Sequence, residues 1–149
     1  MVSTSSVISA ISDDKALSLF KAVALSENDY SNLLISKLRL SRRQYYSTMM
    51  ELMDADLVRR ISGRYSLTSL GKIMFNSYLK IETAIKYYWK LKAIDSIISR
   101  YRELPPKECQ HIIDNIIDND EIKEMLVSKN SFNKSTFTAL ANTAYQQTH

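Results

Sequence analysis

Arginine is the most concentrated chemically active residue type in this chain. Six of its eight arginines fall in the 28 residues from Lys37 to Arg64, where only three acidic residues oppose them. A guanidinium group donates hydrogen bonds in pairs, to phosphate oxygens or to the edge of guanine, so this segment could bind nucleic acid. The alternative is an ordinary solvated basic surface. The net charge of +4 is unevenly divided, because residues 1–104 hold 16 basic and 10 acidic residues and residues 105–149 hold 4 and 6.

Other kinds of chemistry are poorly supported by the residue types present. The two glycines are eight positions apart, which excludes a glycine-rich phosphate-binding loop. A single cysteine, Cys109, excludes an internal disulfide and a cysteine-based zinc site. Cys109 and His111 lie two apart on a predicted helix and do not share a face, as a metal pair would. No catalytic triad or carboxylate pair stands out, so we expect neither an enzyme nor a cofactor or metal.

Composition indicates a mostly helical globular chain. Of 149 residues, 45% are hydrophobic and 24% charged, with only two glycines and two prolines. No apolar run approaches the roughly 18 residues needed to span a membrane, and the first dozen residues lack the features of a signal peptide. We therefore expect a cytoplasmic protein that does not cross a membrane.

The elements around the arginines follow from periodicity and capping residues. Ser12 is a candidate N-cap for a helix that ends near Leu25, and a polar loop follows at 26–29. The pattern then predicts a short helix over 30–37, a three-residue turn, and a helix over 42–55 that begins after the N-cap Ser41. That helix carries an apolar stripe of Tyr45, Met49, Leu52 and Met53.

A β-hairpin and a long helix are predicted next. Residues 57–61 and 65–67 read as strands around a Ser62-Gly63 turn, and Thr68 or Ser69 caps a helix over 70–101. The fold class is therefore mainly α, with a three-helix core, a two-stranded wing, a long helix and short extra helices. We expect a flexible N-terminus (1–11), a winged helix-turn-helix domain (12–70), a long dimerisation helix (70–104), short helices (105–130) and a disordered tail (131–149).

This order of elements is that of a winged helix-turn-helix, which presents the start of its third helix to the major groove of DNA. At the start of that helix, a hydroxyl group can bind a phosphate, a guanidinium group can bind guanine or a phosphate, and an amide can bind adenine. Arginines beside the turn of the hairpin can bind a neighbouring DNA backbone or the minor groove. Of the adjacent Arg59 and Arg60, strand alternation directs one towards the core side of the hairpin. The candidate DNA-binding residues are Ser41, Arg42, Arg43, Gln44, Tyr46, Arg60, Ser62 and Arg64.

The segment ISKLRLSRRQYYSTMMELMDADLVRRISGRYSLTSLGK, residues 35–72, resembles the winged helix-turn-helix of archaeal transcription regulators of the ArsR/MarR-like kind. The likeness rests on the turn before Ser41, the D-A-D-L-V at the end of the third helix, the R-Y-S-L-T strand and the S-L-G-K that opens the next helix. It extends over about residues 12–100, and IKYYWKLKAIDSI (85–97) resembles thaumarchaeal members. Asp56 stands where the family usually has glycine. The resemblance implies double-stranded DNA as the partner and the third helix as the reader.

The long helix leaves an apolar stripe that one small domain does not cover, formed by Tyr87, Leu91, Ile94, Ile98 and Tyr101. Pairing with a second copy would make a homodimer whose two reading helices meet successive half-sites. The alternative is that the helices after Pro105-Pro106 fold back and cover the stripe within one chain.

Two functions follow from these patterns. The first is a sequence-specific DNA-binding transcription regulator that acts as a homodimer. The second is a winged-helix protein–protein interaction module within a larger assembly. The excess of arginine around the third helix and the hairpin favours the first.

Overall fold

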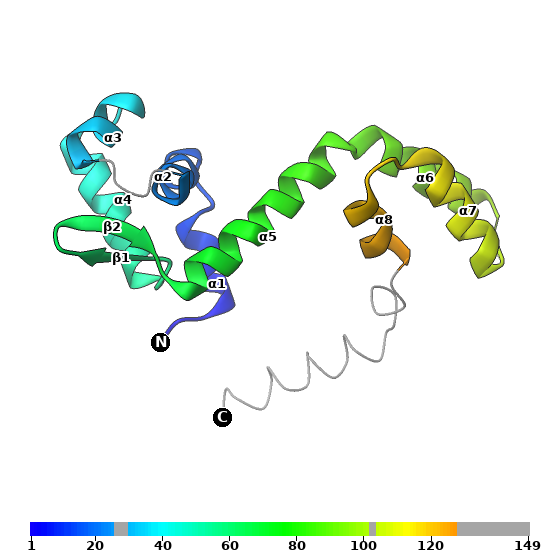
Figure 1. Ribbon diagram of the computed structural model, residues 1–149, viewed down its shortest axis with the longest axis horizontal. Coiled ribbons are helices and arrows are strands. Elements are labelled where there is room, and N and C mark those ends of the chain that lie inside the picture. The colour runs from blue at the N-terminus through cyan, green and yellow to red at the C-terminus, as the bar shows by residue number, and fades with distance from the viewer. Residues whose placement is uncertain (26–29, 102–103, 128–149) are drawn as a thin grey trace. The chain divides into compact units, whose positions relative to one another are not determined.

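The computed structural model describes residues 1–25, 30–101 and 104–127 (Figure 1). Within them the chain is mainly helical, with one small antiparallel sheet of two strands, an arrangement compatible with a winged-helix class. The chain divides into two compact units, Met1–Ile81 and Glu82–His149. The predicted loop at 26–29 and the predicted tail at 131–149 lie outside the described residues.

The first unit follows the predicted order of elements, with one addition at its start. Its elements are α1 (Thr4–Ala10), α2 (Asp14–Leu25), α3 (Ser31–Lys37), α4 (Arg42–Asp54), β1 (Val58–Ile61), β2 (Arg64–Leu67) and the beginning of α5 (Ser69–Lys86).

The expectation of a flexible N-terminus over residues 1–11 is wrong. Ser3 and Ser6 form a reciprocal capping box that starts α1, and Val7 and Ala10 are buried in the core of the first unit. Ser12, the expected cap of the next helix, instead donates its hydroxyl to the Ser9 carbonyl. The carboxylate of Asp13 accepts from the backbone N–H of Ala16 and so caps α2.

The core of the first unit lies between α2, α4 and the hairpin. The apolar stripe predicted along α4 is confirmed, because Tyr45, Met49 and Leu52 are fully buried. Residues of α2 on the facing side, Leu19 and Phe20, are fully buried in the same cluster. Burial of one side of α4 leaves its other side available to solvent.

The turn between α3 and α4 has a backbone that glycine would favour, although it contains none. Arg39 adopts a φ of 51°. The N–H groups of Arg39 and Leu40 donate to the carbonyls of Ser36 and Ile35, at 3.2 and 3.1 Å, which is a Schellman cap on α3. Ser41 follows at once as the N-cap of α4. Because one helix ends and the next begins within four residues, the start of α4 is held in place.

α4 ends in the same way, at Asp56, which has a φ of 56°. Asp56 and Leu57 donate to the carbonyls of Met53 and Leu52 at 2.9 and 3.0 Å. A left-handed residue at this position is what a glycine supplies without strain, and aspartate tolerates it better than most residues. The chain then enters β1 directly.

The two strands pair with Ile61 opposite Arg64, so the connecting loop is Ser62-Gly63. Both loop residues have positive φ, 49° and 80°, as a type I′ turn requires. The predicted hairpin and its turn are therefore confirmed, with β2 beginning one residue earlier than expected.

The start of α5 packs closely against the start of the hairpin. Thr68 is the cap: its hydroxyl accepts from the Gly71 N–H at 2.9 Å and donates to the Asp56 carbonyl. A Cβ added to Gly71 would lie 2.0 Å from the Leu57 carbonyl oxygen. Only glycine permits this approach of helix to strand.

The single long helix predicted over 70–101 is wrong, because Tyr87 divides it into α5 and α6 (Tyr88–Arg100). Tyr87 has φ −92° and ψ 8°, outside the helical range, and its N–H is shared between the carbonyls of Thr83 and Ala84. The Tyr87 hydroxyl donates a hydrogen bond to Asp118, a contact that no local pattern encodes. The second unit continues with α7 (Pro106–Ile116) and α8 (Asp120–Val127).

In the second unit, α7 and α8 cover the apolar stripe that we expected to join two chains. Ile94 retains only 4% exposure and forms a cluster with Ile113, Ile117 and Ile122. Three other stripe residues, Tyr87, Leu91 and Ile98, pack against that cluster, and Tyr101 is 61% exposed. The stripe is therefore not the open dimerisation surface that the sequence predicted; of the two arrangements considered, the structure has the one within a single chain.

Asp118 joins the parts of the second unit. Its carboxylate lies 3.0 Å from the Lys90 ammonium of α6 and also accepts from the Tyr87 hydroxyl. The two hydrogen bonds, that from Lys90 first, lower the pKa of Asp118, and the contact with Asp118 raises the pKa of Tyr87. Lys90 lies above the Tyr87 ring, 5.2 Å from its centroid.

Candidate nucleic-acid interface

Arg42 and Arg43 occupy the first two positions of α4, and both side chains are exposed. Tyr45, two residues on, is fully buried and fixes which side of the helix faces solvent. Neither arginine makes a hydrogen bond or ion pair within the described ranges 1–25, 30–101 and 104–127. Their guanidinium groups are thus available to an external acceptor.

The position of these two arginines opposes the stability of the helix. The N-terminus of a helix carries about half a positive charge, so acidic side chains are favourable there and basic ones cost about 0.3–1 kcal/mol each. The first turn of α4 contains no acidic residue. An anionic ligand at this end would meet the guanidinium groups and the helix dipole together.

Ser41 and Gln44 form a capping box, which changes the role predicted for Gln44. The Gln44 N–H donates to the Ser41 hydroxyl oxygen at 3.1 Å, and Gln44 Oε1 accepts from the Ser41 N–H at 3.0 Å. Bidentate recognition of adenine requires the amide oxygen as an acceptor and the amide nitrogen as a donor. Since the oxygen is engaged in the cap, Gln44 retains its two N–H donors. The Ser41 hydroxyl proton remains able to donate to a phosphate.

The exposed side of α4 continues past the arginines with Tyr46 and Met50. The Tyr46 ring packs edge-on against Tyr45, with 5.2 Å between centroids, and half of the residue is exposed. Met50, seven positions after Arg43 and so on the same face, is 59% exposed and was not among the predicted site residues. Its apolar side chain could contact a thymine methyl group.

On the hairpin, Arg60 lies on the sheet face directed towards α4. It pairs across the strands with Tyr65, and its guanidinium carbon is 5.7 Å from the Tyr65 ring centroid. The Tyr65 ring in turn makes an edge contact with Tyr45 of α4 at 6.3 Å. Arg59 has Ser66 as its partner and lies on the other face. Arg60 shares its face of β1 with the buried Val58, so alternation directs Arg60 towards the core side as expected, although both arginines are exposed.

Arg64 and Ser62 lie at the end of the hairpin. Ser62 is exposed in the turn, and Arg64 begins β2 with its guanidinium carbon 5.8 Å from the Tyr30 ring centroid, at the N-cap of α3. Tyr30 and Ser31 are adjacent, and the buried Tyr45 hydroxyl donates to the Ser31 hydroxyl at 3.2 Å. The hydrogen bond joins the start of α3 to α4, while burial raises the pKa of Tyr45. Aromatic rings thus position the hairpin and both helices relative to one another.

Metal-binding clusters and membrane-spanning helices are both absent from the described part of the chain. No group of three or more histidine, cysteine, aspartate or glutamate side chains there could hold a metal ion. Likewise, none of the described helices has the length and apolar character needed to cross a membrane.

Comparison with known proteins gives no relative: no protein-family model, curated protein or solved structure matches this chain. The interpretation of the interface therefore depends on its own geometry and chemistry.

Proposed function

We propose that this protein is a winged helix-turn-helix transcription regulator that binds double-stranded DNA. The observation that carries the proposal is the pair of exposed arginines on the first turn of α4, which pair with no other described residue and stand at the end of the helix where they oppose folding. Residues placed against stability are typical of functional sites. The described parts of the first unit contain the helices and hairpin that such a domain needs.

In this proposal α4 enters the major groove with its N-terminal turn. Arg42 and Arg43 donate to guanine edges or phosphates, the Ser41 hydroxyl to a phosphate, and Tyr46 and Met50 contact the groove. Arg60 and Arg64 on the hairpin, which serves as the wing, contact the neighbouring backbone or minor groove. Dimerisation through the stripe of α6 is not part of the proposal, because α7 and α8 cover most of that stripe.

A mobility-shift titration on a random-sequence duplex across a salt series tests the proposal. Affinity should fall steeply with salt, since each neutralised phosphate contributes about 0.9 to the logarithmic slope. The double variant R42A/R43A should bind more weakly, and its slope should be smaller by about one for each phosphate that it no longer neutralises. The matched control is K92A/K107A, which removes the same charge from exposed positions of the second unit.

Two results would contradict the proposed contact of α4 with DNA. One is the absence of a shift, or a shift that does not depend on salt, which would favour a winged-helix protein-interaction module. The other is an equal loss of affinity in both double variants, because the loss would then follow from net charge alone.

A further inference from the structure

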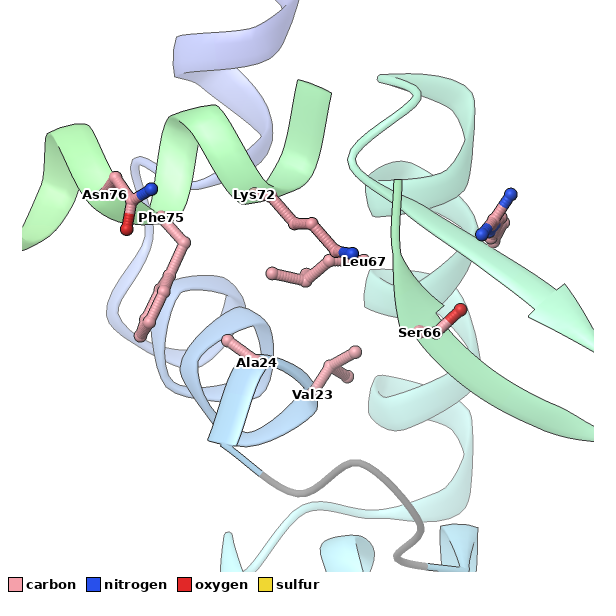
Figure 2. A pocket seen from close by; sticks show the side chains of 8 residues that line it. Val23, Ala24, Ser66, Leu67, Lys72, Phe75 and Asn76 are labelled. Carbon is pink, nitrogen blue, oxygen red and sulfur yellow. The ribbon is translucent and has the colours of Figure 1, made fainter. Parts of the chain in front are cut away.

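A pocket of about 480 Å³ lies in the first unit beside α2, the hairpin and α5 (Figure 2). Its volume is within the range of small-molecule sites, roughly 300–1,000 Å³. α2, the two strands and α5 all contribute to it. The lining residues are Val23, Ala24, Arg59, Ser66, Leu67, Lys72, Phe75 and Asn76.

The floor of the pocket is apolar and held in place by the core. Val23 and Leu67 belong to the buried cluster of the first unit. Phe75 packs edge-on against the fully buried Phe20, with 6.1 Å between ring centroids. Figure 2 shows the Phe75 ring directed from α5 towards α2, beside Ala24. A flat apolar group would find a preformed surface here.

The polar lining is entirely cationic or neutral. Arg59 and Lys72 supply two positive charges, while Ser66 and Asn76 supply a hydroxyl and an amide. None of the eight lining residues is acidic, and neither cation has an ion pair with another residue that the structure describes. Figure 2 shows the Lys72 side chain extending from α5 in the direction of Leu67. None of these four polar residues was among the predicted site residues.

We propose that this pocket binds a small phosphomonoester that carries a flat apolar group. A phosphomonoester has a charge of about −1.5 to −2 at neutral pH, which matches two cations better than a carboxylate does. The apolar group would cover Phe75 and Leu67. A phosphodiester of DNA has a single charge, and its bases are not free to reach the floor. The inference does not rest on the proposed function.

Titration calorimetry of the full chain with 1-naphthyl phosphate tests this proposal. Inorganic phosphate supplies the anion without the ring, and 1-naphthol supplies the ring without the anion. Because the pocket offers partners to both parts, naphthyl phosphate should bind at least about tenfold more tightly than either fragment. Equal affinity of naphthyl phosphate and naphthol would overturn the proposal, since the cations would then contribute nothing.

Charge-removing variants identify the site. K72Q and R59Q should each weaken naphthyl phosphate binding about fivefold or more, and both replace exposed side chains, so the fold should be retained. K15Q on α2 removes the same charge outside the pocket and should leave the affinity unchanged. If K72Q and R59Q weaken duplex binding yet leave naphthyl phosphate binding intact, the cations serve DNA phosphates and the proposal is wrong.

Discussion

At the scale of single residues, Arg42 and Arg43 represent a conflict between stability and binding. They are exposed at the positive end of α4 and pair with no other described residue. Their neighbours Ser41 and Gln44 do the opposite, because their capping box stabilises the same helix end. One turn of helix therefore combines two residues that secure it with two that weaken it.

Replacing Arg43 with glutamate should separate these effects. We expect R43E to raise the free energy of unfolding by roughly 0.3–1 kcal/mol, because an acidic side chain suits the helix N-terminus. The same variant should weaken duplex binding. Urea denaturation and mobility shifts measure the two quantities.

The control for R43E is R100E, which places the same charge change in the last turn of α6, where a basic side chain is favourable. R100E should lower stability. A loss of stability in R43E as well would contradict the conflict described for α4.

The two glycines should respond differently to alanine. G71A should cost about 3 kcal/mol, because its Cβ would lie 2.0 Å from a backbone oxygen of Leu57 and force helix and strand apart. G63A has nothing within 4 Å, and only its φ of 80° opposes a side chain, so about 1–2 kcal/mol is expected. Thermal or urea denaturation of both variants measures which of the two loses more stability. Equal losses would mean that the structure around Gly71 relaxes.

At the scale of elements, Tyr87 shows where local pattern fails. Apolar residues recur at helical spacing through Tyr87, and neither glycine nor proline interrupts them. The break coincides with a partner distant in sequence, Asp118, and with the packing of α7 and α8 on α6. Periodicity contains no information about such partners, so it predicts a continuous helix.

The titration of Asp118 provides a measure of that interaction. Its pKa is lowered below the ordinary value of 3.8, chiefly by Lys90 and then by Tyr87. A lowered pKa in the folded state stabilises the fold above the unfolded value, and that stabilisation is lost as pH falls through the folded pKa. An NMR titration of the carboxyl should show a midpoint below 3.8 that rises in K90Q. An unchanged midpoint would contradict the ion pair.

Elements defined by neighbouring residues were predictable, and those defined by distant ones were not. The N-cap Ser41, the stripe of α4 and the Ser62-Gly63 turn are local signals, and the structure has all three. The many serines of α1 are typical of a disordered, polar terminus. Val7 and Ala10, three positions apart, are the local signal that could have predicted a helix with one buried face.

Site prediction has the same limit. Sequence placed Arg42 and Arg43 on an exposed helix start, but it did not separate the capping role of Gln44 from base reading. Arg59 and Lys72 are 13 positions apart, and only the folded hairpin brings them to one pocket.

At the scale of the whole molecule, the second unit covers most of the apolar stripe of α6 with its own helices, so no second chain is needed to bury it. Ile94 is buried by α7 and α8. Removing those helices should expose that surface and cause self-association. A chain shortened to end at Leu104 should therefore self-associate. In light scattering, the ratio of its measured mass to the mass of one chain should exceed that of the full chain at the same molar concentration.

The full chain is the reference for that measurement. If the shortened chain remains monomeric at tens of micromolar, the stripe is not adhesive once uncovered. If the full chain already dimerises and the variant I94K abolishes the dimer, the stripe pairs between chains and the cover by α7 and α8 is incorrect.

Arg39, Asp56 and Ser62, the left-handed residues other than glycine in the described part of the chain, also define how distant relatives of this chain could be recognised. Each position excludes β-branched residues for reasons of backbone geometry, irrespective of what the side chain binds. Gly71 adds a fourth fixed point, because only a residue without Cβ fits there. Diverging lineages can exchange every arginine of the interface and still keep a spacing of 17, 6 and 9 residues between these four positions. We expect that spacing, occupied by Gly, Asn, Asp or other tolerant residues, to persist where side-chain similarity has disappeared.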